Sequence, residues 1–134
     1  MFLKNCWYVA AWSKDVDREL LGRVLLNNYI VFYRKEDGTP VALENRCPHR
    51  NLPLSEGRLI GDDIECGYHG MIFNCDGDCI HLPGSETAPT WATVKRYPVA
   101  ERNGWLFYWP GDPSKADEAL LPDYHQYNEN EHWI

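Results

Sequence analysis

Long hydrophobic runs and positive charges are both scarce in this chain of 134 residues. The longest apolar run near the start, from Cys6 to Trp12, is far shorter than the ~20 apolar residues of a membrane-spanning helix. Only one Lys precedes it, and Lys14 and Asp15 follow it after a single serine, so it does not match a signal peptide. The sequence holds 13 Lys and Arg against 20 Asp and Glu, and no basic stripe stands out. Nucleic acids and membranes are therefore poor partners, and we expect a cytoplasmic protein.

Aromatic residues, by contrast, are abundant: six Trp, eight Tyr and four Phe. Rings of this size suit a small β domain, in which large side chains fill thin layers. Short runs of β-branched and aromatic residues, separated by turn residues, indicate the same all-β class. A chain of this length is expected to form one domain with one core. We predict strands at residues 23–26, 29–34, 40–44, 59–60, 64–65, 71–73, 79–80, 93–99 and 105–109.

The sequence changes character after Pro110, where a Gly-Asp-Pro run ends the β pattern. We predict one or two helical turns at residues 114–121, with Ser114 as the N-cap. The remaining residues are polar and aromatic without a clear period, which is typical of a linker. We therefore expect a domain at residues 1–112 and a linker at residues 113–134.

Two short segments, a Cys-Pro-His and a Cys-Gly-Tyr-His sequence, carry the residues with metal-binding chemistry. Each offers one thiolate and one imidazole, and sixteen residues separate His49 from Cys66, so the pattern is C-x-H-x16-C-x2-H. Two cysteines on one iron and two histidines on the other are the ligands of a Rieske [2Fe–2S] cluster. The sequence therefore predicts a one-electron carrier with four cluster ligands: Cys47, His49, Cys66 and His69.

Two other interpretations of these residues stay open on spacing alone. Two Cys and two His also hold structural zinc in a tetrahedral site. Zinc fingers, however, usually place Cys near Cys and His near His, whereas each pair here is mixed. The other interpretation is that the four side chains are ordinary core and surface residues. The mixed pairs favour the cluster over both.

Three cysteines lie outside these motifs: Cys6, Cys75 and Cys79. Cys75 and Cys79 flank an Asp-Gly-Asp turn, so a disulfide across that turn is one interpretation. Disulfides are rare in the reducing cytosol, however. We therefore expect small buried or half-buried thiols at all three positions.

Six segments are informative beyond the ligands: Asn5-Cys6-Trp7-Tyr8-Val9-Ala10, Leu21-Gly22-Arg23, Cys47-Pro48-His49-Arg50, Pro53-Leu54-Ser55, Cys66-Gly67-Tyr68-His69-Gly70 and Trp109-Pro110-Gly111-Asp112. Together they resemble the N-terminal domain of Rieske non-haem iron oxygenases. Within that family, the chain is most similar to the oxygenase component of vanillate O-demethylase and to its dicamba and toluenesulfonate monooxygenase relatives. The resemblance covers the chain from about residue 4 to residue 134.

The resemblance implies a Rieske-type small antiparallel β-sandwich. In such domains a cluster-binding hairpin subdomain carries the metal at its tip, and we expect a short helical or irregular C-terminal tail. A proline-containing loop, here residues 82–85, would partly cover the cluster.

The resemblance also bears on the reduction potential. High-potential Rieske proteins of the cytochrome bc complexes have a disulfide between the two ligand loops, and a serine and a tyrosine that donate hydrogen bonds to the cluster. Here Leu52 and Tyr68 stand at the disulfide positions, Met71 at the serine and Phe73 at the tyrosine. Because these donors stabilise the reduced form, their absence predicts a potential toward the low end of the Rieske range.

The family's oxygenases hold a second, mononuclear Fe(II) with two histidines and one carboxylate. The ligands follow a D-x2-H-x4-H pattern in a C-terminal catalytic domain. This sequence lacks that pattern, because its other histidines are only His81, His125 and His132. The chain is thus expected to contain no catalytic residue and to be the electron-transfer part of an NADH-dependent monooxygenase or O-demethylase.

The partners implied by the resemblance are a flavin and iron–sulfur reductase as electron donor, and the parent protein's own catalytic domain or a neighbouring subunit as acceptor. The parent is expected to be a homotrimer and the isolated chain mainly a monomer. Two alternatives remain: a stand-alone Rieske ferredoxin and a zinc-stabilised interaction module. The linker-like tail argues against a stand-alone ferredoxin.

Overall fold

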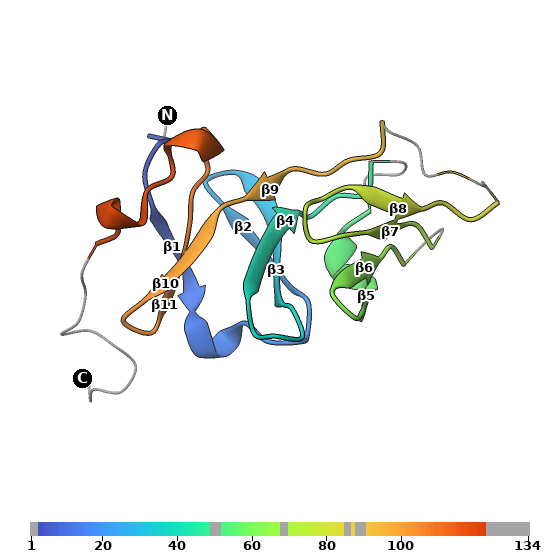
Figure 1. Cartoon of the computed structure of the whole chain (residues 1–134), viewed down its shortest axis with the longest axis horizontal. Coiled ribbons are helices and arrows are strands. Elements are labelled where there is room, and N and C mark those ends of the chain that lie inside the picture. The colour runs from blue at the N-terminus through green and yellow to red at the C-terminus, as the bar shows by residue number, and fades with distance from the viewer. Residues whose placement is uncertain (1–2, 49–51, 68–69, 85–86, 88–90, 123–134) are drawn as a thin grey trace.

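The structure, a computed structural model, describes residues 3–48, 52–67, 70–84, 87 and 91–122. In this part of the chain, three antiparallel sheets follow one another along the long axis of the molecule (Figure 1). The outer sheet has the order β1 (Tyr8–Trp12), β11 (Trp105–Tyr108), β10 (Val99–Arg102). The central sheet has the order β2 (Leu21–Leu25), β3 (Asn28–Arg34), β4 (Pro40–Glu44), β9 (Arg96–Tyr97). The hairpin sheet has the order β5 (Arg58–Ile60), β6 (Asp63–Glu65), β7 (Ile72–Phe73), β8 (Cys79–His81).

The central sheet is covered on both faces, and β3 shows why. Ile30 and Phe32 point into a core shared with the outer sheet, whereas Val31 and Tyr33 point into a core shared with the hairpin sheet. Successive side chains of a strand alternate between its two faces. A strand buried on both faces therefore needs a continuous hydrophobic run, and all four of these side chains are fully buried.

A third, smaller core lies on the far side of the outer sheet. Trp7 and Trp109 meet there edge to face, with ring centroids 5.2 Å apart. Leu121 packs onto the same core, and the indole N–H of Trp7 donates to the backbone carbonyl of Asp117 at 2.8 Å. The segment after β11 therefore packs against the outer sheet up to Leu121.

Most predicted strands are confirmed, but the prediction of one strand at residues 93–99 is wrong. Pro98 divides it, so that β9 pairs with β4 in the central sheet and β10 pairs with β11 in the outer sheet. Proline has no N–H for the ladder and so interrupts a continuous strand. The structure also adds β1, which the sequence did not predict.

The predicted one or two helical turns of the tail are two short 3₁₀ turns, η3 (Pro113–Lys115) and η4 (Glu118–Leu120). Ser114, predicted as N-cap, lies inside η3. The cap is Asp112, whose carboxylate accepts a hydrogen bond from the backbone N–H of Ser114 at 3.0 Å. Proline at the first position of the turn makes the preceding residue the N-cap. Two further 3₁₀ turns lie among the described residues: η1 (Ser13–Asp15) and η2 (Leu54–Glu56).

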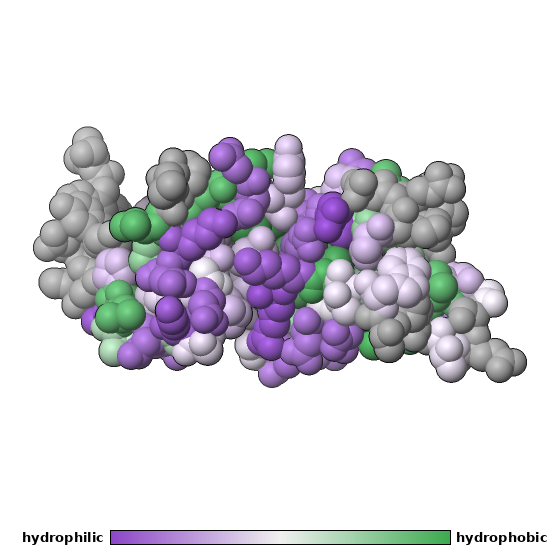
Figure 2. All heavy atoms as spheres, turned by 90° about the horizontal axis from the view of Figure 1, so that it is seen from above, coloured by the Kyte–Doolittle hydropathy of each residue, from purple (hydrophilic) through white to green (hydrophobic). Residues whose placement is uncertain are grey.

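The surface seen from above is mostly hydrophilic over the middle of the molecule, with hydrophobic side chains in small groups (Figure 2). No helix in the described residues is both long and apolar enough to cross a membrane. The polar cover agrees with a domain whose buried apolar side chains form three cores.

Candidate metal centre

The two predicted ligand motifs begin loops that are closed in the same way. We call residues 47–52 the first ligand loop and residues 66–71 the second. In each, the backbone N–H of the cysteine donates to the carbonyl five residues later, from Cys47 to Leu52 and from Cys66 to Met71, both at 2.7 Å. The first loop connects β4 to η2, and the second connects β6 to β7. His49 and His69, the other two predicted ligands, lie outside the described residues.

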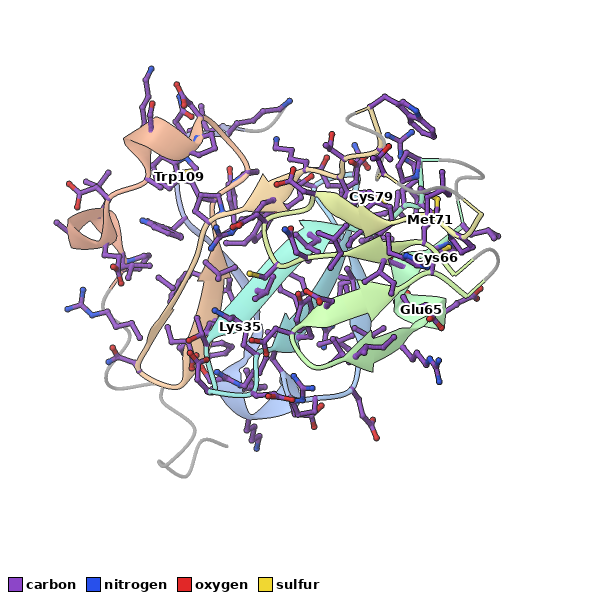
Figure 3. All side chains as sticks on the ribbon, turned by 45° about the vertical axis from the view of Figure 1, so that its right-hand side comes forward. Lys35, Glu65, Cys66, Met71, Cys79 and Trp109 are labelled. Atoms are coloured by element: carbon purple, nitrogen blue, oxygen red, sulfur yellow. The ribbon has the colours of Figure 1, made fainter. Side chains whose placement is uncertain are left out.

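The thiols of Cys47 and Cys66 are almost completely buried, with 1% and 2% of each residue exposed. Both belong to the core between the central and hairpin sheets, together with Met71, whose sulfur lies 3.8 Å from the Cys47 sulfur. Figure 3 shows Cys66 and Met71 near one another at the end formed by β6, β7 and β8. Two thiols brought from separate loops into one dry core suit a shared metal group, because a buried thiolate needs a cation beside it.

The second ligand loop and the residue before it pack closely against the end of η2, the turn that follows the first ligand loop. A Cβ atom on Gly57 would lie only 1.9 Å from the carbonyl oxygen of Glu65, the residue before Cys66. A Cβ on Gly67 would lie 3.2 Å from the carbonyl oxygen of Glu56. Only glycine permits the first approach, so Gly57 lets the segment after η2 lie against the residue that precedes the second ligand loop. Sequence reasoning missed this role, although Gly57 directly follows the Pro-Leu-Ser-Glu segment that comes after the first motif.

The described part of the proline-containing loop, residues 82–84, lies beside the second ligand loop, and its cover of a cluster stays a prediction. A Cβ on Gly70 would contact the ring carbon Cγ of Pro83 at 3.4 Å. Leu82 packs against the core that contains both cysteines. This part of the loop therefore covers the second ligand loop with apolar atoms, which limits the access of water.

Ion pairs flank both ligand loops. Arg46 and Glu44 pair at 3.0 Å just before the first loop, and Arg58 and Glu65 pair at 2.9 Å across β5 and β6 just before the second. Both arginines are at least half exposed, so these pairs add little to stability.

The remaining cysteines are thiols, as the sequence predicted. All five cysteines lie among the described residues, and none forms a disulfide. Cys79 is buried in the same core as Cys47 and Cys66, and its Sγ atom donates to the carbonyl oxygen of His81 at 3.3 Å. Burial raises the pKa of the Cys79 thiol. Cys79 is thus a protonated, inert neighbour of the predicted ligands.

Comparison with known proteins agrees with the motifs and the loops. The family of the Rieske [2Fe-2S] domain matches residues 6–98. The chain belongs to this family. It is 48% identical over 125 residues to the iron–sulfur subunit of the toluene-4-sulfonate monooxygenase system of Comamonas testosteroni, which covers 92% of the chain and 36% of the relative. It is 42% identical over 121 residues to a vanillate O-demethylase oxygenase subunit of a Pseudomonas species, covering 90% of the chain and 34% of the relative.

Solved structures give the same fold. A crystal structure of dicamba monooxygenase with non-heme iron and dicamba matches with a TM-score of 0.87 and 40% identity, covering 92% of the chain and 38% of that protein. The predicted all-β Rieske fold is confirmed, and so is the resemblance to oxygenase components of this group. The chain spans only a little over a third of the length of these relatives.

Proposed function

We propose that the chain transfers electrons through a Rieske-type [2Fe–2S] cluster bound by Cys47, His49, Cys66 and His69. The observation that carries the proposal is the pair of buried thiols, which are delivered to one core by two loops closed with the same hydrogen bond. The family match over residues 6–98 supports the same cluster. The mixed Cys and His spacing supplies the two imidazoles that distinguish it from an all-cysteine cluster.

When bound, such a cluster takes up and releases one electron at a time. The chain's own residues hold its two thiolates and keep water away from them. Met71 and Phe73, both fully buried, supply no hydroxyl group to the sulfur atoms. Because donors to the sulfurs would stabilise the reduced state, we propose a potential toward the low end of the Rieske range.

We further propose that the parent protein is an NADH-dependent monooxygenase or O-demethylase that acts on aromatic acids in the cytoplasm. The printed activities of the toluenesulfonate and vanillate relatives support this class. A mononuclear Fe(II) would lie in a catalytic domain outside this chain, as the non-heme iron of dicamba monooxygenase suggests. A flavin and iron–sulfur reductase would donate the electrons, and a catalytic domain of the same or a neighbouring subunit of a homotrimer would accept them.

The domain boundary after residue 112 also stays a proposal. The family match ends at residue 98, whereas η3, η4 and Leu121 pack onto the outer sheet. In the proposed arrangement, residues 113–134 connect the cluster domain to the catalytic domain, and the residues up to Leu121 pack against the outer sheet.

The cluster assignment is tested by Cys66→Ser, with Cys79→Ser as the matched control. Both thiols lie in the same core, and only Cys66 is a proposed ligand. Reconstituted Cys66→Ser should lose the brown absorption completely, whereas Cys79→Ser should keep it. A normal cluster spectrum in Cys66→Ser contradicts the assignment.

The proposal for the parent protein is tested by the reading frame and by turnover. A D-x2-H-x4-H motif downstream of Ile134 supports an oxygenase, and a stop codon there supports a stand-alone ferredoxin. The cluster-loaded chain should be reduced by NADH and a reductase, and should form no product from a methoxybenzoate, O2 and ferrous iron. Stoichiometric demethylation would mean that this chain itself holds a catalytic iron.

A further inference from the structure

A side-chain pair closes the base of the first ligand loop. Asn45 directly follows β4 and Ser55 lies in η2, so the two residues stand on either side of residues 46–54. The Asn45 amide donates from Nδ2 to Ser55 Oγ at 3.0 Å, and its Oδ1 accepts from the Ser55 backbone N–H at 2.8 Å. Both hydrogen bonds are partly buried. The two ends of the loop are therefore joined twice by one amide.

The pair is enclosed by the neighbouring strand. Gly22 in β2 leaves no space for a side chain, because a Cβ atom there would lie 2.8 Å from Ser55 Oγ and 2.9 Å from Asn45 Nδ2. The Asn45 backbone N–H is bonded to the carbonyl of Tyr29 in β3 at 2.8 Å. The pair is thus anchored to the central sheet and protected on its β2 side.

The same segment extends to the second ligand loop. Two residues after Ser55, Gly57 lies against the carbonyl of Glu65, which directly precedes Cys66. A shift of Ser55 would be passed along the backbone to Gly57 and to its contact with Glu65. The Asn45–Ser55 pair is therefore connected through short backbone segments to both cysteines.

We propose that Asn45, Ser55 and Gly22 are positioning residues that fix the relative placement of the two ligand loops. Through this placement they slow the loss of the cluster and set the symmetry of the ligand field around its irons. This inference rests on the proposed cluster. None of the three residues is a ligand. Groups that orient metal ligands contribute strongly to metal retention, and their loss typically weakens it about 10- to 100-fold.

The test is Asn45→Ala in the whole 134-residue chain, loaded with cluster, with Asn74→Ala as the matched control. Asn74 also makes two hydrogen bonds, because its Oδ1 accepts from the backbone N–H groups of Asp76 and Asp78 at 3.0 Å. It caps the β7–β8 turn and not a ligand loop. Circular dichroism should show that the sheets of both variants are retained. Asn45→Ala should release iron to a chelator about tenfold faster, with a shifted and broadened paramagnetic resonance spectrum in the reduced state.

A conservative variant separates positioning from general loss of stability. In Asn45→Asp, one carboxylate oxygen accepts from the Ser55 N–H and the other accepts from the Ser55 hydroxyl, so both links survive. Iron release and the resonance spectrum should then return close to those of the unchanged chain. Ser55→Ala, which removes only the hydrogen bond to the hydroxyl, should release iron at a rate between those of the unchanged chain and Asn45→Ala. If Asn45→Ala does not fold, the iron release of Ser55→Ala tests the proposal in its place.

Three results would overturn the inference: unchanged iron release in Asn45→Ala or Ser55→Ala, equal acceleration in Asn74→Ala, or no recovery in Asn45→Asp. Failure of the proposed function has a different signature. In that case the unchanged chain itself forms no cluster with two cysteines and two histidines, before any variant is compared.

Discussion

The two ends of the molecule are stabilised differently. At the scaffold end, formed by the outer and central sheets, β3 has seven residues and the core between the sheets contains Phe32, Tyr97 and Tyr108. At the ligand end, formed by the hairpin sheet and the two ligand loops, no strand exceeds three residues. In the described chain, the buried sulfur atoms of Cys, and of Met71, all belong to the core at this end. Figure 3 shows the separation, with Cys66, Met71 and Cys79 at one end and Trp109 at the other.

This difference indicates that the two ends depend on the metal to different degrees. Long strands with packed rings form a sheet that is stable without a metal. Strands of two or three residues bury little surface on their own, and small metal sites are commonly stabilised by the metal they bind. We therefore expect the ligand end to depend on the cluster and the scaffold end to be independent of it.

The largest expected effect follows removal of the cluster by a chelator under reducing conditions. Amide hydrogen exchange in β5 to β8 should accelerate by about 100-fold or more, because local opening there no longer disrupts metal bonds. Exchange in β3 and β4 should change only a few-fold. Mass spectrometry of peptides from each sheet provides the measurement. Equal acceleration of exchange in all three sheets would show that the scaffold end depends on the cluster as much as the ligand end does.

A matched pair of core substitutions comes next. Leu43 and Leu106 are both fully buried, but Leu43 faces the ligand-end core and Leu106 faces the core between the outer and central sheets. Leu43→Ala and Leu106→Ala should each lower the free energy of unfolding by about 2–5 kcal/mol. Only Leu43→Ala should also accelerate cluster loss. Chemical denaturation and iron release measure the two effects. Identical iron release in both variants would contradict the expected difference between the two cores.

A smaller effect is expected at Met71, whose sulfur lies 3.8 Å from the Cys47 sulfur. In Met71→Ser, the hydroxyl can donate a hydrogen bond to a cluster sulfur and stabilise the reduced state. A charge-assisted bond of about 1.5 kcal/mol corresponds to a rise of about 60 mV for one electron. Met71→Leu is the control and should leave the potential unchanged. Protein-film voltammetry measures both, and a fall in the Met71→Ser potential would contradict the account.

The smallest effect concerns acid stability at the scaffold end. Arg34 donates to the Glu101 carboxylate at 2.6 Å, and this hydrogen bond holds the Glu101 pKa below its ordinary value despite the opposing effect of burial. The unfolded chain therefore binds this proton more readily than the folded chain does. The pair's contribution to the free energy of unfolding is complete above the ordinary Glu pKa, and it is lost as the pH falls through the lower pKa of the folded state. Glu101→Gln should flatten this acid decline in urea unfolding between about pH 5 and pH 3 and leave the cluster potential unchanged. An unaltered acid slope would show that the pair does not carry the effect.

Local patterns predicted the elements that depend on near neighbours. The strands predicted at residues 40–44, 59–60 and 64–65 followed from β-rich runs, and all three are confirmed. The strands predicted at residues 23–26 and 29–34 pair as β2 and β3, but the turn between them lies one residue earlier than predicted, because Leu26 and Asn27 both adopt positive φ. The four ligand residues were predicted from residue type and spacing, because metal chemistry restricts which residue types can stand there, and this assignment stays a prediction.

Features that depend on contacts between residues far apart in the sequence were not predicted. β1 was missed because its residues pair with β11, almost a hundred positions away. The strand at residues 93–99 was assigned as one because nothing local shows that Pro98 is where the chain passes between two sheets. Gly57 and the Asn45–Ser55 pair likewise act through approaches that only the folded chain reveals.

The central claim, a cluster with two cysteine and two histidine ligands, is tested most directly by the magnetic couplings of the reduced protein. The chain is produced with ¹⁵N-labelled histidine, loaded with iron and sulfide, and reduced. Pulsed electron paramagnetic resonance should then show strong coupling to two histidine nitrogens, and each of His49→Cys and His69→Cys should remove one of them. A spectrum without histidine coupling, or a silent protein that contains zinc, would contradict the claim.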